Sequence, residues 1–165
     1  MTKKRILFVC MGNICRSPAA ETIMKKLIAD NDLTNRIEVD SAGTIDYHEG
    51  EQADPRMRAS ADNRGYNVDS IARQFDPNKD FERSDYIVTM DNDNFEDIKS
   101  LDYQNKYRNK IFRIADFFSN HSYNKIPDPY YSGKDGFELV LDLLEDSAKG
   151  LLKKVIEDDE RQNQK

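Results

Sequence analysis

A cysteine and an arginine stand six positions apart near the N-terminus, in the run Cys-Met-Gly-Asn-Ile-Cys-Arg-Ser of residues 10–17. A cysteine thiolate is a strong nucleophile, and an arginine guanidinium can hold two oxygens of a phosphate at once. Cys10 and Arg16 therefore favour chemistry on a tetrahedral oxyanion, in which the cysteine attacks and the arginine holds the oxygens.

The residues before and after Cys10 predict a curled loop that leaves a buried strand. The apolar run 6–9 precedes Cys10, and Gly12 and Asn13 tolerate positive φ at little cost. A loop of this kind can aim successive backbone N–H groups at one point, which suits an anion.

A helix is expected to follow the loop directly. Ser17 is a preferred N-cap and Pro18 is favoured at the first helical position, so we expect the helix to begin there. Its positive end would add to the anion site, and helix N-termini and neighbouring arginines lower the pKa of thiols. We therefore expect Cys10 to be a thiolate at neutral pH, with the Ser17 hydroxyl as a further donor.

Three segments together resemble the low-molecular-weight protein tyrosine phosphatases. They are residues 9–18 (Val-Cys-Met-Gly-Asn-Ile-Cys-Arg-Ser-Pro), 41–44 (Ser-Ala-Gly-Thr) and 128–131 (Asp-Pro-Tyr-Tyr), in the order usual for that family. The resemblance covers nearly the whole chain and implies a protein-tyrosine-phosphatase that works through a cysteinyl-phosphate intermediate.

The resemblance also implies roles for individual residues. Cys10 would be the nucleophile, Arg16 the phosphate clamp, and Asp128 the general acid and later the base. Taken alone, Asp128 between two prolines is only a common turn signal. The residues expected to bind the phosphate are Met11, Gly12, Asn13, Ile14, Cys15 and Ser17.

Aromatic residues are expected to wall the cleft. Tyr130 and Tyr131 would flank its mouth, and Tyr47 would form the opposite wall, which favours aryl phosphates. Residues 47 and 48 are Tyr-His where relatives often carry a Trp-containing segment, so the sequence departs from the commonest pattern here. Ordinary surface packing stays an alternative for Tyr47 and Tyr130.

A few residues are expected to support the site. By resemblance, Ser41 gives Asn13 the hydrogen bond that a left-handed conformation needs. Thr44 and Asp91 either support the site or simply cap a turn or helix. Cys15 either packs inward or forms a reversible disulfide with Cys10 that protects the nucleophile from irreversible oxidation.

Three other activities compete with this interpretation. Arsenate reductases of the same scaffold use two further cysteines, whereas this chain has none after Cys15, including in residues 73–83. Protein-arginine phosphatases of this fold usually place Thr at the position of Ile14. A non-catalytic phosphate-binding module would lack the nucleophile or the acid.

Composition restricts the partners. The formal net charge of −6 argues against nucleic acid, and the chain has no 18-residue apolar stretch and no signal-peptide pattern. We therefore expect a cytoplasmic enzyme that does not bind membranes, whose partners are a phosphotyrosine-containing protein or peptide and inorganic phosphate as product and competitive ligand. His48 and His121 are expected to be solvent-facing bystanders, and we expect no metal and no cofactor.

The remaining pattern predicts a single-domain, three-layer α/β fold with a four-stranded parallel sheet flanked by helices. Strands are expected at 6–9, 37–41, 86–90 and 110–114, with the third central and the fourth at an edge. Helices are expected after residues 18, 54 and 91, and a long closing helix starts at a capping box of Asp135 and Glu138. The domain is assigned to residues 1–158, with fraying expected from Glu157 and a polar tail at 159–165.

This arrangement would bring chemistry to one edge of the sheet. Cys10, Ser41 and Asp91 fall at or just past the carboxyl ends of three strands, where open parallel sheets bind their ligands.

Overall fold

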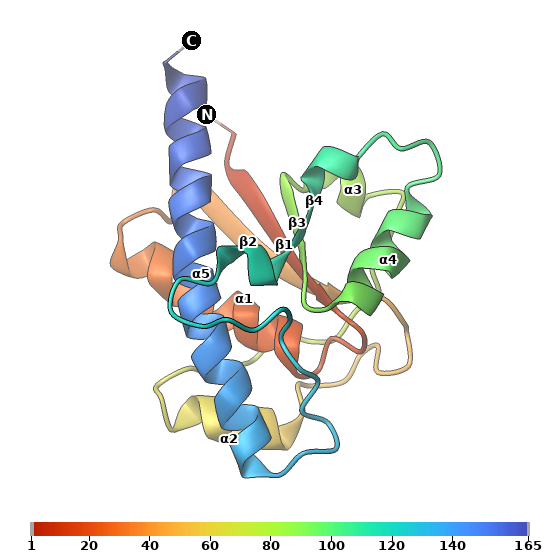
Figure 1. Ribbon diagram of the computed structural model, residues 1–165, viewed down its shortest axis with the longest axis vertical. Helices are drawn as coiled ribbons and strands as arrows, with labels where there is room; N and C mark the ends of the chain where they lie inside the picture. Colours follow the sequence, from red (N-terminus) through yellow and green to blue (C-terminus); the bar gives the residue numbers. More distant parts are fainter. Residues whose placement is uncertain (1, 165) are drawn as a thin grey trace.

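The sheet has four parallel strands, as the sequence predicts. The computed structural model describes residues 2–164 and places β1 at Lys4–Cys10, β2 at Ile37–Gly43, β3 at Tyr86–Thr89 and β4 at Ile111–Arg113. Their order is β2-β1-β3-β4, and all three pairings are parallel (Figure 1). The expected central position of β3 and edge position of β4 are therefore confirmed.

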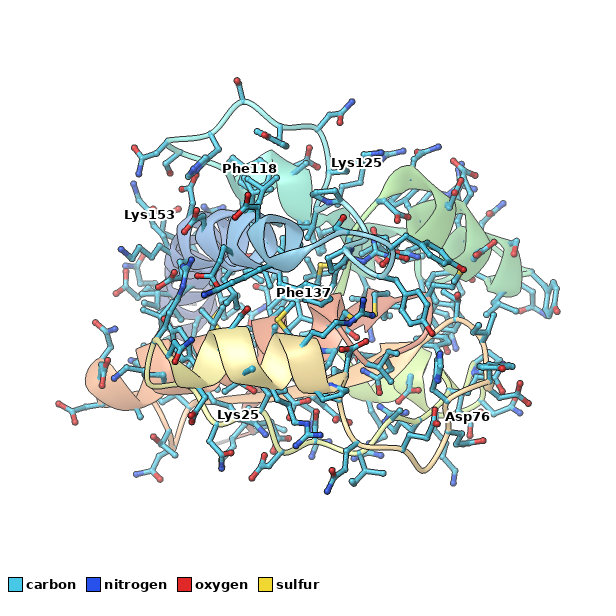
Figure 2. All side chains as sticks on the ribbon, turned by 90° about the horizontal axis from the view of Figure 1, so that it is seen from below. Lys25, Asp76, Phe118, Lys125, Phe137 and Lys153 are labelled. Carbon is cyan, nitrogen blue, oxygen red and sulfur yellow. The ribbon has the colours of Figure 1, made fainter. Side chains whose placement is uncertain are left out.

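Helices connect the strands and cover both faces of the sheet. They are α1 (Arg16–Asp30), α2 (Pro55–Asp62), α3 (Asp80–Arg83), α4 (Asn92–Leu101) and α5 (Lys134–Asn163), with short 3₁₀ turns at Arg108–Lys110 and Ile114–Phe117. The four-residue helix α3 was not predicted. Helix α2 packs against the first turns of α5, and Figure 2 labels Phe137 between the two ribbons.

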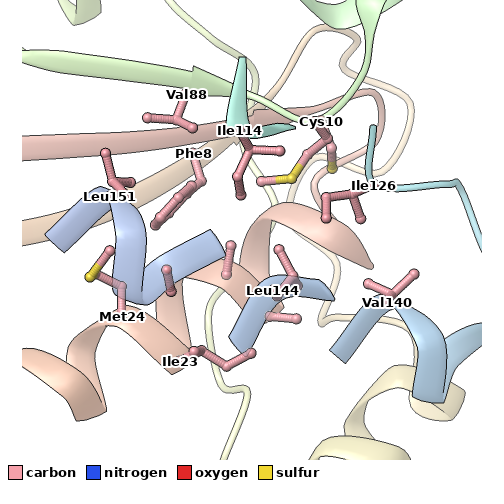
Figure 3. Close-up of a cluster of buried hydrophobic side chains, with 14 of the residues drawn as sticks. Phe8, Cys10, Ile23, Met24, Val88, Ile114, Ile126, Val140, Leu144 and Leu151 are labelled. Carbon is pink, nitrogen blue, oxygen red and sulfur yellow. The ribbon is translucent and has the colours of Figure 1, made fainter. Parts of the chain in front are cut away.

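Two hydrophobic cores follow from the alternation of side chains along β1. Phe8 faces the larger core, which α1 and α5 complete, while Leu7 and Val9 face a smaller core with α3 and α4. Figure 3 shows the larger core, with Phe8 and Val88 on the side of the sheet and Met24 of α1 and Leu151 of α5 on the side of the helices. Cys10 lies at the rim of this core, so the nucleophile candidate stands on a rigid support.

The C-terminal helix is longer and begins earlier than expected. The predicted fraying from Glu157 is wrong, because α5 continues to Asn163. Its last turns are held to the sheet: Tyr86 donates a 2.6 Å hydrogen bond to Asp158, and Arg36 forms an ion pair with Asp159. The predicted capping box is also wrong, since Gly133 is the N-cap and no side chain caps the helix.

The register of the sheet brings three strand ends to one level. Cys10 pairs with Gly43 at the end of β2, and Val9 pairs with Thr89 at the end of β3. A Cβ added at Gly43 would lie 2.7 Å from the Met11 carbonyl oxygen, so only glycine allows this close approach. The loop after β1 is thereby pressed against the carboxyl edge of the sheet.

Candidate active site

The loop after β1 curls as predicted, but the helix begins two residues earlier than expected. Asn13 has φ 57°, the left-handed conformation expected from the sequence. Helix α1 starts at Arg16, and its N-cap, Cys15, makes no capping hydrogen bond. The prediction of Ser17 as N-cap and Pro18 as first helical residue is therefore wrong: Ser17 lies inside the first turn, and its hydroxyl turns to the nucleophile candidate instead.

Cys10 is buried at the floor of the loop with polar groups around its sulfur. Its Sγ lies 3.0 Å from the Ser17 Oγ and accepts a 3.3 Å hydrogen bond from the Asn13 backbone N–H. The side chain is 2 % exposed. Donors placed in this way stabilise negative charge on a sulfur atom.

Asn13 connects the loop to three other parts of the chain. Its Nδ2 donates to Ser17 Oγ (2.8 Å) and to Ser41 Oγ (3.0 Å), and its Oδ1 accepts from the Arg73 N–H (3.0 Å). The hydrogen bond to Ser41 was predicted. Ser41, which lies inside β2 rather than at its end, donates in turn to Glu21 Oε1 at 2.6 Å. These contacts fix a backbone conformation that would otherwise be strained.

Arg16 is almost fully buried and is held from two sides. Its Nη1 donates to Asp91 Oδ2 (2.6 Å) and to the Ile126 carbonyl (3.0 Å), and its Nη2 lies 3.7 Å from Asp128 Oδ2. Burial opposes its charge, but the surrounding acidic groups, Cys10 among them, outweigh burial and raise the pKa of Arg16 above its ordinary value. The guanidinium is a fixed cation.

Asp91 has both of the roles that the sequence left open. One of its oxygens accepts from Arg16, and the other accepts a 2.8 Å hydrogen bond from the Asn94 N–H as the N-cap of α4. The capping bond fixes the carboxylate that orients the guanidinium. The Thr44 hydroxyl shows neither of the two roles left open for it, since it is buried without a hydrogen-bond partner within residues 2–164; the Thr44 backbone N–H donates to the Cys10 carbonyl at 2.9 Å.

Asp128 reaches the same cleft from a distant loop. Its side chain is 41 % exposed, with Oδ2 towards Arg16 and Oδ1 accepting a 3.1 Å hydrogen bond from the Tyr130 N–H. A carboxylic acid at this edge can pass a proton to a group bound over the loop.

The cleft above the loop has a volume of about 320 Å³. It is lined by Cys10, Met11, Gly12, Ile14, Cys15, Arg16, Ile45, Tyr47, His48, Asp128, Tyr130 and Tyr131. All three predicted tyrosines are therefore part of its wall, with Tyr131 and Tyr47 strongly exposed and Tyr130 less so. Asn13 and Ser17 do not line it; their side chains support the floor from below.

Neither histidine is the bystander expected from the sequence. His48 lines the cleft, where its ring lies edge-on to Tyr47 and its Nδ1 contacts the Glu51 carboxylate. It also lies so close to the loop that a Cβ at Gly12 would come within 3.0 Å of its Cδ2. His121 forms a 2.8 Å contact with the buried carboxylate of Asp146.

Cys15 packs inward beside the cleft as a free thiol. Burial, followed by the charges of Asp54 and Cys10, raises the pKa of Cys15 well above its usual range. Its thiol is therefore neutral at physiological pH and is not a second nucleophile.

Several residues of the site were missed by the sequence reasoning. Glu21 stands one helical turn after Ser17, so helical spacing could have placed it on the same face. The Arg73 N–H and the Ile126 carbonyl are backbone groups of distant segments, and no local pattern indicates them. Asp54 was predicted only as the start of a helix, α2, and its partner Arg56 was not singled out.

Residues 2–164 contain neither a metal-binding cluster nor a membrane-spanning helix. No group of three or more His, Cys, Asp or Glu side chains is arranged to hold a metal ion. Every helix in this part of the chain is too short or too polar to span a bilayer.

Comparisons with known proteins agree with this geometry. Residues 5–162 match the family model described as low molecular weight phosphotyrosine protein phosphatase. The low molecular weight protein-tyrosine-phosphatase of Streptomyces coelicolor is 40% identical over 155 residues, which cover 93% of this chain and 94% of that protein.

Solved structures give the same result. A protein tyrosine phosphatase from Entamoeba histolytica, with Hepes in its active site, superposes with a TM-score of 0.92 at 48% identity, covering 95% of this chain and 99% of that one. A Drosophila arginine phosphatase superposes with a TM-score of 0.84 at 29% identity, covering 91% and 96%.

Proposed function

Because this chain belongs to the low molecular weight phosphotyrosine protein phosphatase family, and is thus a hydrolase, we propose that it hydrolyses phosphotyrosine and other aryl phosphate monoesters through a cysteinyl-phosphate. The observation that supports this most directly is the position of Arg16, which lies beside Cys10 in the cleft lining and within 3.7 Å of Asp128. One cation thus joins the candidate nucleophile and the candidate acid in a single cleft.

In the first step the Cys10 thiolate attacks phosphorus and the ester P–O bond breaks. The phosphoryl group moves to sulfur, and Asp128 gives its proton to the departing phenolic oxygen. An unprotonated phenolate is a poor leaving group, since phenol has a pKa near 10. Arg16 and the loop N–H groups neutralise charge on the three equatorial oxygens.

In the second step Asp128 acts as a base. Its carboxylate takes a proton from a water molecule, whose oxygen attacks phosphorus while the S–P bond breaks. The Cys10 thiolate is restored, and inorganic phosphate leaves with the new P–O bond. Ser17, 3.0 Å from the sulfur, stabilises the thiolate as it re-forms.

The cleft walls favour an aromatic substrate. Tyr47 and Tyr131 stand strongly exposed at its mouth, where an aryl ring can pack between aromatic faces. A phosphotyrosine-containing protein or peptide is therefore the proposed partner, and inorganic phosphate is expected to bind competitively as the product.

Arginine phosphatase activity is the second candidate, since the Drosophila arginine phosphatase shares this fold at 29% identity. Ile14 lines the cleft here and favours phosphotyrosine, because it fills space with an apolar side chain. Arsenate reduction by a cysteine cascade is disfavoured, because Cys10 and Cys15 are the two cysteines of the sequence.

A side-by-side assay of phosphotyrosine, phosphoserine, phosphoarginine and arsenate tests the proposal. We expect turnover of phosphotyrosine above the others, and loss of that turnover in Cys10→Ser. Rapid quenching should recover phosphate bound covalently to the native protein. Faster turnover of phosphoarginine would select the second candidate, and absence of any turnover would favour a binding module.

A further inference from the structure

Arg56 is clamped by its neighbour Asp54 at the start of α2. Its Nε donates to Asp54 Oδ1 at 3.0 Å and its Nη2 donates to Oδ2 at 2.8 Å, a two-pronged pairing that fixes the plane of the guanidinium. Asp54 is buried, and the hydrogen bonds from Arg56 hold its pKa below the usual value. The pair is therefore ionised and rigid.

The fixed guanidinium lies against two aromatic rings. Its central carbon is 5.2 Å from the ring centre of Tyr130 and 4.9 Å from that of Phe137. Phe137 is buried in the first turns of α5, between that helix and α2 in Figure 2. Cations within about 6 Å of a ring face are attracted to it. Arg56 therefore holds the Tyr130 ring next to the buried Phe137.

Tyr130 in turn holds the carboxyl group of Asp128. Its backbone N–H donates to Asp128 Oδ1 at 3.1 Å, which leaves Oδ2 directed towards Arg16. At the opposite end of this series of contacts, Asp54 binds the loop after β1, since its N–H donates to the Ile14 carbonyl at 2.8 Å. A continuous chain of contacts therefore runs from the loop after β1 to Asp128.

We propose that Arg56 is a positioning residue for the general acid. By clamping Tyr130 it sets the distance between Asp128 and a phosphate ester bound over the loop. This inference rests on the proposed function and extends it to a residue outside the cleft lining. Its alternative is direct binding of an acidic substrate side chain, because the Arg56 side chain is 47 % exposed.

The kinetic test compares two aryl phosphates in Arg56→Gln. We expect kcat for phenyl phosphate, whose leaving group needs the proton, to fall about tenfold, a fraction of the roughly 10²–10⁴ that a general acid contributes. For p-nitrophenyl phosphate, whose leaving group needs it little, kcat should change by less than about twofold. Arg56→Lys should not rescue, because an ammonium cannot chelate both oxygens of Asp54. The matched control is Arg58→Gln, which lies two residues further along α2 and donates from its Nε to the Ala53 carbonyl; it should leave both rates unchanged.

A double mutant separates positioning from general damage. If Arg56 acts through Asp128, Arg56→Gln should cost nothing more in an Asp128→Ala background. Further loss there, or equal loss for both substrates, would overturn the proposal. A change confined to KM for phosphopeptides would overturn it too and assign Arg56 to substrate binding.

An NMR measurement decides the contact without relying on turnover. Amide hydrogen exchange at Tyr130 should accelerate in Arg56→Gln and stay unchanged in Arg58→Gln, with equal melting temperatures confirming that both variants are folded. Unchanged exchange at Tyr130 would refute the clamp. Wild-type protein that turns over neither aryl phosphate would instead refute the proposed function, and the exchange result would still stand on its own.

Discussion

Arg16 donates a 2.6 Å hydrogen bond to Asp91, and this contact joins the first turn of α1 to the first turn of α4. The two helices lie on opposite faces of the sheet, so the contact crosses its carboxyl edge. Asp91 is held by its own capping bond to Asn94, and the guanidinium therefore has one orientation. A site built in this way depends on the fork shape of Arg16 as well as on its charge.

Arg16→Lys should reduce kcat/KM for p-nitrophenyl phosphate by about 10²-fold or more, even though the charge is kept. An ammonium cannot bind Asp91 and two phosphate oxygens in the same planar arrangement. Steady-state kinetics of purified variants measure the loss, and Arg58→Lys makes the same chemical change outside the cleft. Near-native turnover of Arg16→Lys would remove the bidentate role.

Asp91→Asn separates orientation from capping. Asparagine is as good an N-cap as aspartate, so α4 should keep its stability, while Arg16 loses the charge that orients it. We expect a melting temperature close to that of the wild type and a loss of kcat smaller than in Arg16→Lys. A large fall in melting temperature with unchanged kcat would make Asp91 a cap alone.

Asp128→Ala should slow phenyl phosphate hydrolysis by about 10²–10⁴-fold and p-nitrophenyl phosphate hydrolysis far less. The difference arises because the nitro group stabilises the leaving phenolate without a proton. Rates for a series of substituted phenyl phosphates measure this as a steeper dependence on the leaving group. Asp97→Ala, on the exposed face of α4, is the control. Equal losses across the series would exclude Asp128 as the acid.

Local sequence patterns were sufficient for the sheet and for the loop. The strands are short apolar runs between turn signals, and Gly12 and Asn13 fit a curled loop, so the central position of β3, the edge position of β4 and a positive φ in the loop could be predicted. Local rules failed where a distant group decides. Ser17 has the propensity of an N-cap, but its hydroxyl contacts the Cys10 sulfur, and the N-cap is Cys15, two residues earlier.

Long-range contacts explain the other errors. The last turns of α5 are too polar to be recognised as packed, yet Tyr86 and Arg36 bind them from the sheet and the segment before it. His48 enters the cleft wall because the loop after β2 folds back over Gly12. Arg56 was overlooked because its partners, Tyr130 and Phe137, lie more than seventy positions away in the sequence.

Asn13 offers a comparison of conformation with hydrogen bonding. Asn13→Ala removes the hydrogen bonds to Ser17 and Ser41. It also leaves an alanine at φ 57°, a left-handed conformation that costs a residue with a Cβ about 1–2 kcal/mol. Asn13→Gly removes the same bonds but adopts this φ freely. Both should lose activity by about tenfold or more, since small displacements of a catalytic loop are costly. The melting temperature should be lower for Asn13→Ala than for Asn13→Gly. Full activity in the glycine variant would mean that only the backbone conformation matters.

The disulfide between Cys10 and Cys15 stays a prediction. Peroxide followed by a thiol reductant should restore activity in the native protein, whereas Cys15→Ser should recover poorly because its Cys10 oxidises further. Mass spectrometry of the peroxide-treated protein should find the linked pair, with a loss of two hydrogens. Equal recovery in both proteins would show that Cys15 gives no protection.

The hydrogen bonds of the Asp146 carboxylate predict how the stability of the protein changes in acid. This carboxylate accepts hydrogen bonds from the Ser119 and Asn120 N–H groups and contacts His121. Because Asp146 belongs to α5, these contacts anchor to that helix the segment that leads to Asp128. Burial raises its pKa, but these hydrogen bonds outweigh burial and hold the pKa of Asp146 below its ordinary value. A carboxyl group with a lowered pKa in the folded state stabilises that state above the unfolded pKa, and this contribution disappears as the pH falls through the folded pKa.

Asp146→Asn should therefore lower the melting temperature by about 3–8 °C at pH 7, from the loss of hydrogen bonds to a charged group. The difference from the wild type should begin to shrink as the pH falls below about 4, the ordinary pKa of an aspartate in the unfolded chain, and should disappear below the lower pKa of the folded state, where the native carboxyl is neutral too. Calorimetric scans at pH 7, 5, 4 and 3 measure this, with Asp97→Asn as a control on an exposed face. A difference that stays constant over the whole range would mean that the charge of Asp146 contributes nothing and that shape alone holds the segment.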